Sequence, residues 1–292
     1  MIIDYTLAAA PAGEITLDVL DASGNRVRRL SSTSPEPVAE AARPPMPTFW
    51  EGSPERLTTD VGGNRVSWDL RYDAPPVFAH SFEITANPGL TPPSPEGPMA
   101  PPGTYTLRLT VNGRSYTQPV TVRKDPRSPA TIADLQAQHA LQMKIMKGLQ
   151  ISWDAYQQVA AVRRSAQQMV APDAPADVKA ALATFEATID SVAGDTAIAS
   201  QFSLAGGPAP APKFVDVNVA LVSQLKAQDY ADQAPTPAMI AGWKAACEAL
   251  GTALRQWQRV STSDVNAFGK ALGRSDIVSV ISTTKALPAP TC

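Results

Sequence analysis

Few residues of this sequence are of the types that carry acid–base, metal or nucleophilic chemistry. The chain holds two histidines, His80 and His139, and two cysteines, Cys247 and Cys292. His139 has no second histidine or cysteine three or four positions away, so the helical pair typical of a zinc site is missing. We expect His139 to be a satisfied core or boundary residue. His80 lies in a proline-flanked loop, where it either packs locally or contacts a ligand.

Three carboxylates, Asp69, Asp73 and Glu83, surround one predicted strand and the loop that follows it. Two carboxyl groups roughly 5 to 9.5 Å apart are the machinery of glycoside hydrolysis. The spacing in the sequence does not supply that separation, so solvated carboxylates are the simpler interpretation. The chain also has no Gly-x-Ser-x-Gly motif and no glycine-rich phosphate loop. We therefore expect no catalytic residues, no metal site and no cofactor.

Aromatic residues lie within or beside the long loops, at Phe49, Trp50 and Tyr72. Exposed aromatic side chains stack on sugar rings or anchor a partner protein, and buried ones pack the loops onto their own domain. Phe49, Trp50, Tyr72 and His80 are the candidate ligand or partner contacts of this sequence.

Composition excludes several classes of partner. The net charge is −2, with 25 basic and 27 acidic residues, so no overall positive field attracts nucleic acid. No apolar stretch approaches the roughly 20 residues that span a bilayer. The first residues, Met1 to Tyr5, show no basic segment leading into an apolar one, so no signal peptide is recognised. We expect neither a nucleic-acid partner nor a membrane span.

The first half of the sequence alternates apolar and polar residues, which predicts short antiparallel strands. Asn112-Gly113 is the favoured pair for a tight type I′ hairpin turn. We expect an immunoglobulin-like β-sandwich over residues 1–127, with Trp68 between its two sheets. The long segments 31–63 and 71–103 are proline-rich and either cover a neighbouring surface or are partly disordered. The predicted strands are 3–7, 14–20, 26–30, 64–70, 104–111 and 114–122.

The second half changes to apolar residues every three or four positions, which predicts helices. Gly194 is expected to end the second helix, and Ser263-Asp264 to cap a short last one. We expect an antiparallel helical bundle over residues 128–292, which makes the whole chain an α+β multidomain protein. The predicted helices are 132–170, 178–192, one starting at 214, 239–257 and a short segment ending before Gly273.

The two cysteines leave two interpretations open. Cys247 lies within a predicted helix, where a small apolar packing residue is the simpler role, and Cys292 is the last residue of the sequence. The alternative is a bridge between them in an oxidising compartment.

Several segments in a fixed order resemble a known family. These segments are similar to the C-terminal region of large bacterial BNR-repeat, sortilin-like propeller proteins, many of which are named glycosyl hydrolases or sialidase-like proteins. The segment Pro-Gly-Thr-Tyr-Thr at 102–106 is also similar to immunoglobulin-like modules of the flagellar hook-capping type. The resemblance covers nearly the whole chain, and its segments are Tyr5–Leu7, Pro11–Gly24, Asn64–Tyr72, Ala100–Leu109 and Val122–Arg127.

This resemblance implies an accessory region, periplasmic or extracellular, that normally follows an exported β-propeller. The propeller of such a protein would hold any catalytic or ligand site, and no catalytic residues are carried over to this chain. The sequence contains no propeller repeats and no Asp-box motifs. Because it begins almost directly on a predicted strand, we expect a fragment or split gene product whose propeller is a separate polypeptide.

Two classes of function follow. The first is a non-catalytic structural and interaction module that docks on a β-propeller protein or domain. The second is a secreted carbohydrate-binding or weakly glycoside-hydrolysing protein that uses loop aromatics and carboxylates. Exposed Trp50 and Tyr72 around a cleft with two facing carboxylates would favour the second class, and buried aromatics would favour the first.

Overall fold

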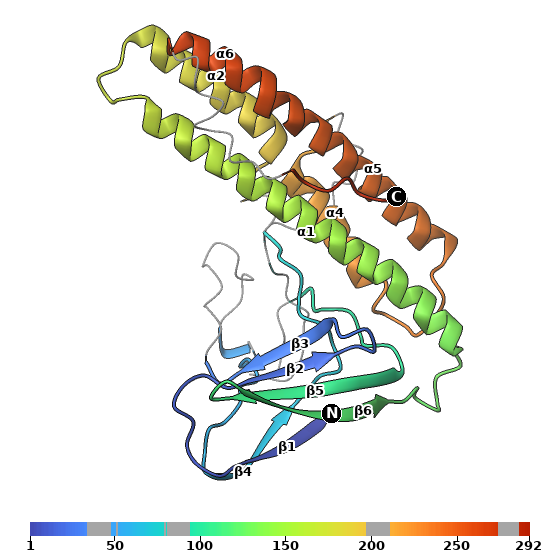
Figure 1. Ribbon diagram of the computed structural model, residues 1–292. Helices are drawn as coiled ribbons and strands as arrows, with labels where there is room; N and C mark the ends of the chain where they lie inside the picture. Colours follow the sequence, from blue (N-terminus) through green and yellow to red (C-terminus); the bar gives the residue numbers. More distant parts are fainter. Residues whose placement is uncertain (34–47, 51, 79, 81–93, 197–210, 274–285) are drawn as a thin grey trace. The chain divides into compact units, whose positions relative to one another are not determined.

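The computed structural model describes residues 1–33, 48–50, 52–78, 80, 94–196, 211–273 and 286–292 (Figure 1). Strands come first and helices second, so the chain is a mixed α and β protein with antiparallel sheets, as predicted. It divides into two compact units, each described by itself below. The strand unit comprises 1–75, 80–143 and 225–236, and the helical unit comprises 76–79, 144–224 and 237–292. Separate domains at 1–127 and 128–292 stay a prediction.

The described residues of the strand unit form six strands in two antiparallel sheets. One sheet has four strands in the order β3-β2-β5-β6, and the other pairs β1 with β4. The long-range pairs β1–β4 and β2–β5 join segments that are distant in the sequence. The strands are β1 Ile2–Leu7, β2 Thr16–Leu20, β3 Arg26–Ser31, β4 Gly62–Ser67, β5 Gly103–Val111 and β6 Arg114–Val122.

The β5–β6 hairpin confirms the turn predicted from Asn112-Gly113. Both turn residues have positive φ angles, 48° at Asn112 and 76° at Gly113, as a type I′ turn requires. The strands then pair without interruption from Val111 and Arg114 at the turn to Gly103 and Val122 at the far end.

The predicted strand 64–70 is wrong in its last three residues, because β4 ends at Ser67. The chain turns at Leu70, whose φ of 63° lies in the left-handed region and interrupts a strand. This turn brings Arg71 into an isolated bridge with Met99. The indole nitrogen of Trp68 donates to the Arg71 carbonyl oxygen at 2.9 Å, which satisfies its polar atom inside the core.

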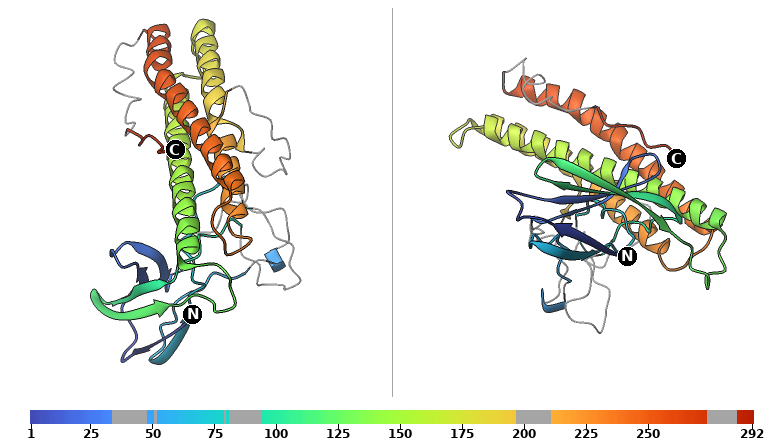
Figure 2. Two further views of the ribbon diagram at one scale, coloured as in Figure 1. Left: turned by 90° about the vertical axis from the view of Figure 1, so that its right-hand side faces the viewer. Right: turned by 60° about the horizontal axis from the view of Figure 1, so that its bottom comes forward.

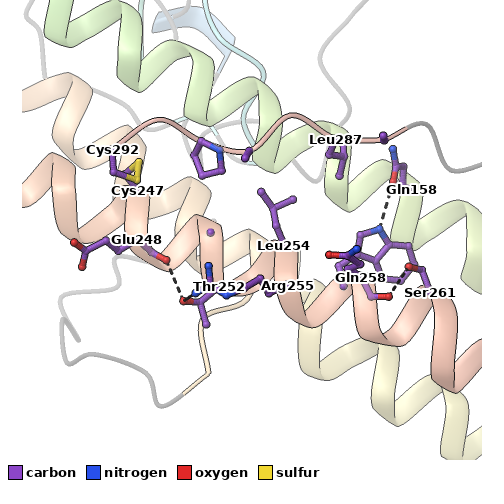
Figure 3. A pocket seen from close by; sticks show the side chains of 15 residues that line it. Gln158, Cys247, Glu248, Thr252, Leu254, Arg255, Gln258, Ser261, Leu287 and Cys292 are labelled. Atoms are coloured by element: carbon purple, nitrogen blue, oxygen red, sulfur yellow. Dashed lines mark hydrogen bonds between the residues drawn. A yellow bond between two sulfur atoms is a disulfide. The ribbon is translucent and has the colours of Figure 1, made fainter.

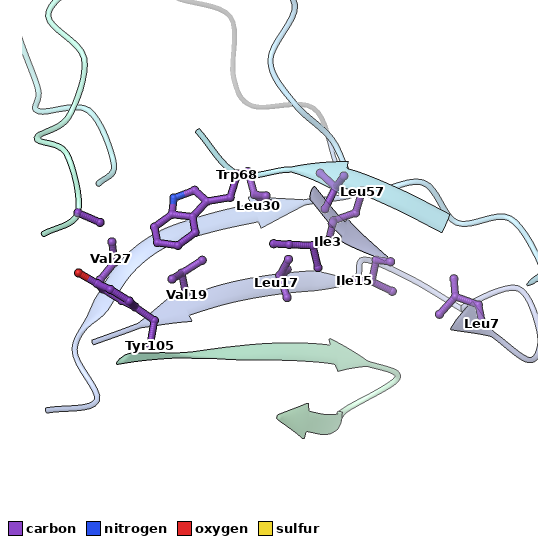
Figure 4. Close-up of a cluster of buried hydrophobic side chains, with 12 residues drawn as sticks. Ile3, Leu7, Ile15, Leu17, Val19, Val27, Leu30, Leu57, Trp68 and Tyr105 are labelled. Carbon is purple, nitrogen blue, oxygen red and sulfur yellow. The ribbon is translucent and has the colours of Figure 1, made fainter. Parts of the chain in front are cut away.

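The strand unit has one apolar core, to which both sheets contribute (Figure 4). Trp68 is at its centre, 1% exposed, with its ring edge-to-face against Tyr105 at 5.7 Å between centroids. Burial raises the pKa of Tyr105 to about 12, and its hydroxyl donates to the Pro101 carbonyl oxygen at 2.6 Å. The core residues are Ile3, Leu7, Ile15, Leu17, Val19, Val27, Leu30, Leu57, Val66, Trp68, Ala100 and Tyr105.

The second half of the chain forms helices, as its three-four periodicity predicts, and Figure 2 shows these helices from two further sides. Gly194 follows the second helix with a φ of 86°, a conformation that glycine adopts without strain, so the predicted end is correct. α2 contacts both α5 and α6, and Phe185 stacks on Phe268 at 4.8 Å. The helices are α1 Ile132–Met169, α2 Ala176–Ala193, α4 Phe214–Ala227, α5 Pro237–Arg259 and α6 Val265–Ala271.

The predicted cap at Ser263-Asp264 is wrong. A π-helical turn, Val260–Asp264, joins α5 to α6, and Asp264 makes no side-chain capping bond. The Val265 N–H already bonds the carbonyl oxygens of Val260 and Thr262, so the helical bonding continues through this point. A capping side chain is needed only where backbone N–H groups lack partners. None of the described helices has the length and apolar character needed to cross a bilayer.

Candidate functional site

The Phe49–Trp50 pair is the most exposed of the predicted contacts. Both residues lie in a short 3-10 turn, Thr48–Trp50, and their rings meet edge-to-face at 5.4 Å. Phe49 is 66% exposed and Trp50 is half-buried. An exposed aromatic ring beside a second ring is the kind of surface that contacts sugars or apolar partner side chains. Their role as contacts stays a prediction.

Tyr72 and His139 pack against each other within the strand unit. Their ring centroids are 5.0 Å apart, and both residues are half-buried. Burial raises the pKa of Tyr72. Burial lowers the pKa of His139, opposed by a hydrogen bond with the Met99 backbone. His139 thus lies at a boundary, as predicted, and its neutral form is favoured. It is not fully satisfied, however, because its Nδ1 atom is buried without a hydrogen-bond partner among the described residues. His80 is half-buried as well.

Arginine side chains pair with the carboxylates that were considered as an acid pair. Arg28 lies 3.6 Å from Asp69 and 3.9 Å from Asp73. Asp73 is also 3.6 Å from Arg26. Glu83 lies outside the described residues. Both described carboxylates are thus ion-paired with arginines, and neither ion pair leaves the two carboxylates facing each other alone.

Asp18 forms the most buried ion pair of the strand unit, which we name the Asp18 clamp. Its side chain is 2% exposed, although it lies on the sheet face opposite the core. Both cross-strand neighbours of Asp18 are arginines, Arg29 on β3 and Arg108 on β5. Arg29 donates to both carboxylate oxygens at 2.6 and 2.9 Å, and Arg108 donates to one at 2.8 Å. The bonds from Arg29, more than those from Arg108, hold the pKa of Asp18 below its usual range.

Arg71 is the centre of a second charged cluster. Its guanidinium donates to both carboxylate oxygens of Asp229, at 3.2 and 2.8 Å, and to the Gly97 carbonyl oxygen at 2.9 Å. Glu96 lies 3.5 Å away, and burial raises its pKa. Glu96 and Asp229 also line a small cavity of about 230 Å³ with Gln142. That volume is below the roughly 300 Å³ at which drug-sized ligand pockets begin.

The residues on the core-facing side of the four-stranded sheet are buried on β2 but partly exposed on β5 and β6. Leu17 and Val19 on β2 are almost fully buried, whereas Leu107, Leu109 and Val111 on β5 are only half-buried. On β6, Tyr116 lies directly opposite Leu109 and is 59% exposed. We name Leu107, Leu109, Val111 and Tyr116 the open inner face. Leu107, Leu109 and Val111 pack partly against the core, and within the described residues the second sheet consists of β1 and β4.

A larger pocket of about 780 Å³ lies in the helical unit, between α5 and the segment 286–292 (Figure 3). We name it the α5 pocket. A disulfide between Cys247 on α5 and Cys292 joins its two sides. The bridge left open by the sequence is therefore present, and the interpretation of Cys247 as a simple packing residue is wrong. Trp257 and Arg255 also line the pocket.

Sequence reasoning missed the Asp18 clamp, the Arg71 cluster and the α5 pocket. Asp18 has the outward position of a solvated residue in the alternating pattern, and only the strand register places two arginines beside it. The described residues include no group of three or more His, Cys, Asp or Glu side chains that could hold a metal ion.

Comparison with known proteins gives no relative from which to transfer a function. No protein-family model, no curated protein and no solved structure matches the chain. Function is therefore argued from the residues of the two units.

Proposed function

We propose that the chain is a non-catalytic accessory module that docks, through its strand unit, on a β-propeller domain or protein. The observation that carries this proposal is the open inner face. Leu109 and Tyr116 face the core side of their sheet, where Leu109 packs only partly against the core and Tyr116 is 59% exposed. An exposed aromatic side chain beside half-buried apolar ones is typical of a surface that binds a partner.

The finer architecture is part of the proposal. An immunoglobulin-like sandwich would occupy residues 1–127, and an antiparallel helical bundle would occupy 128–292. The order β3-β2-β5-β6, opposed by β1-β4 across Trp68, supports the sandwich. The buried stripes of α2 and α5, for example Phe185 and Ile189 on α2 and Trp243 and Leu250 on α5, support the bundle.

A structural role is favoured over hydrolysis by the surroundings of the carboxylates. Asp69 and Asp73 lie beside arginines, and Asp18 is held ionised within its clamp. Glu96 has a raised pKa, as a general acid does, but it lies against the Arg71 guanidinium and a small cavity.

The disulfide supports a location outside the cytoplasm. Bridges such as Cys247–Cys292 persist in the periplasm and in the extracellular space, while cytosolic thiols are kept reduced. We place the chain in one of these compartments. The propeller as partner follows from the sequence resemblance, because propellers precede the similar regions in that family.

The test is affinity capture from the envelope fraction of the native host, followed by mass spectrometry, with the oxidised chain as bait. Tyr116→Arg puts a charge on the open inner face, and Thr121→Arg puts the same charge on the opposite face of β6 as a matched control. We expect the natural chain and Thr121→Arg to capture a propeller protein, and Tyr116→Arg to capture none. Equal capture by both variants, or the absence of any propeller protein, would reject the proposal.

Carbohydrate binding is the second candidate, and the exposed Phe49–Trp50 pair favours it. A glycan array probed with the natural chain, Phe49→Ala and Trp50→Ala tests it. Stacking of a sugar on an aromatic ring contributes on the order of 1 kcal/mol to binding. Each substitution should therefore lower the affinity for the glycan about fivefold. Binding that both variants retain would assign the glycan to another surface.

A further inference from the structure

The α5 pocket is larger than the cavity beside Arg71 and lies apart in the sequence from the open inner face. Its volume of about 780 Å³ falls within the roughly 300–1,000 Å³ that small-molecule sites occupy. The pocket follows α5 from Cys247 to the neighbourhood of Ser261. At 1.5 Å of rise per helical residue, that length is about 20 Å, which suits an elongated ligand better than a compact one.

Arg255 supplies the positive charge of the pocket. Its guanidinium donates to the Thr252 hydroxyl at 2.9 Å, so a neutral group orients it. A Cβ atom at Gly251 would lie 3.4 Å from Arg255 Nη1 and 3.8 Å from Pro290 Cγ. The guanidinium therefore passes over the bare helix backbone at Gly251, on the side that the segment 286–292 covers.

No carboxylate in the described part of the chain neutralises this guanidinium. The ion pairs found there involve eight other arginines, and none includes Arg255. Glu248 also lines the pocket, but Figure 3 shows its carboxylate at the disulfide end, pointing away from Arg255. A guanidinium offers several N–H donors to one carboxylate or sulfonate group, and Thr252 uses only one of them.

The remaining lining mixes apolar side chains with the polar Gln258 and Ser261. Leu254 lies on α5, and Leu287 and Pro290 lie on the facing segment (Figure 3). Trp257 closes the floor, with its indole nitrogen donating to the Gln158 side-chain oxygen at 3.3 Å. Because the indole N–H is already bonded, Trp257 offers a ligand its apolar surface only. The pocket thus combines apolar side chains, Leu254 and Leu287 among them, with neutral polar groups and one oriented cation.

The disulfide keeps the second wall in place. Residues 286, 288, 289, 291 and 292 are exposed, and only Leu287 and Pro290 are half-buried. Packing on α5 stabilises such an exposed segment only weakly. The Cys247–Cys292 bond therefore holds the segment against the helix. A wall that is fixed before the ligand arrives lowers the entropy lost on binding.

We propose that the α5 pocket binds an organic anion with an elongated apolar body, of which long-chain carboxylates are the model, and that the Cys247–Cys292 disulfide preorganises the site. The anionic head pairs with Arg255, and the apolar body lies between Leu254 and Leu287.

The test uses the full oxidised chain and the fluorescent anion 1-anilinonaphthalene-8-sulfonate, whose emission rises when it leaves water. We expect one equivalent to bind. Dodecanoate should displace the dye, while dodecylamine, which has the same chain and the opposite charge, should not. Arg255→Gln should weaken dye binding about tenfold, as expected for a charge-assisted bidentate contact.

Matched controls separate this site from general dye binding. Arg259→Gln removes an exposed arginine from the same helix outside the pocket, and Ile240→Gln removes an exposed apolar side chain there. Both should leave affinity within about twofold, whereas Leu254→Gln should weaken it about fivefold, in keeping with the loss of one apolar contact. Far-UV circular dichroism checks that each variant stays folded.

Reduction tests the role of the disulfide. A thiol reductant converts the bond to two thiols and is itself oxidised, and dye affinity should then fall several-fold in the natural chain but not in Cys292→Ser. Three results would overturn the proposal: equal displacement by dodecanoate and dodecylamine, full affinity in Arg255→Gln, or loss of binding in Tyr116→Arg, which would place the dye on the open inner face. Failure of the propeller capture would leave these measurements unaffected.

Discussion

The Asp18 clamp and the α5 pocket both contain arginine side chains, but those side chains have opposite surroundings. In the clamp, Arg29 and Arg108 converge on one buried carboxylate and join three strands. In the pocket, Arg255 is oriented by a hydroxyl group, and a disulfide holds the two walls together. Ion pairs therefore join the strands at the clamp. At the pocket a covalent bond joins the two walls, and the guanidinium has no ionic partner among the described residues.

Among the changes that test this comparison, removal of the disulfide should alter the free energy of unfolding most. The bridge joins residues 45 positions apart, and a cross-link closing a loop of that length is worth up to about 4 kcal/mol. Since most of the segment 286–292 is exposed, we expect Cys292→Ser to lower the free energy of unfolding by about 3 kcal/mol. Thermal unfolding with and without reductant measures it. A natural chain insensitive to reductant would show that charge or packing holds the pocket instead.

Asp18→Asn should have the next largest effect. It leaves Arg29 and Arg108 side by side without the carboxylate that they share. We expect the free energy of unfolding to fall by about 2 kcal/mol, a loss that stays moderate because both arginines are partly exposed. The matched control is Asp4→Asn, since Asp4 forms a similar two-bond pair with Arg65 in full solvent. That change should have no measurable effect on stability. Chemical denaturation measures both variants.

The loss of stability at low pH is a second test of the Asp18 clamp. The pKa of Asp18 is lower in the folded chain than the usual value of 3.8, so its contribution is complete above that pH and is lost as pH falls through the folded pKa. The natural chain should therefore lose stability below about pH 4, and Asp18→Asn should lose less. Parallel acid unfolding curves for the two chains would contradict the role of the clamp.

His139 should give a smaller effect at milder pH. Burial lowers its pKa from 6.5, so the unfolded chain binds the proton more readily and stability falls as pH drops below that value. Substituting His139→Gln removes this titration. We expect the stability of the natural chain to fall more than that of His139→Gln between pH 7 and pH 5, as followed by chemical denaturation. A steeper fall in the variant would mean that His139 is charged when folded.

The smallest effect is expected from Arg255→Gln. Because Arg255 has no ionic partner among the described residues, its loss should change the free energy of unfolding by less than about 0.5 kcal/mol. Chemical denaturation checks it. A loss comparable to that of Asp18→Asn would erase the difference between the two regions and make Arg255 a structural residue.

Local patterns in the sequence identified the elements but not the contacts between distant elements. Alternation found five strands closely, and Asn112-Gly113 fixed the β5–β6 turn, because these signals lie within a few residues. The end of β4 was predicted three residues too late. Leu70 turns the chain in a left-handed conformation, which a leucine in the sequence does not indicate. The helix predicted to start after Asp264 in fact continues from α5 through a π-helical turn.

The candidate site was harder to predict for the same reason. Asp18 has the pattern position of a surface residue, and its burial depends on Arg29 and on Arg108, 90 residues away. The cluster on Arg71 likewise needs Asp229, 158 residues away. Pairing of Cys247 with Cys292 stayed open because sequence does not supply the Cα–Cα distance, which is 5.6 Å in the structure.

The central position of β2 has a consequence for the order in which the chain folds. β2 pairs with β3 across a short turn, but its other neighbour is β5, which is synthesised much later. The four-stranded sheet is therefore incomplete until residues 103–111 have left the ribosome. Sheets built on such distant pairings fold slowly, whereas helices form from local contacts. The β2–β3 pair thus waits as part of an incomplete nascent sheet until β5 has been synthesised.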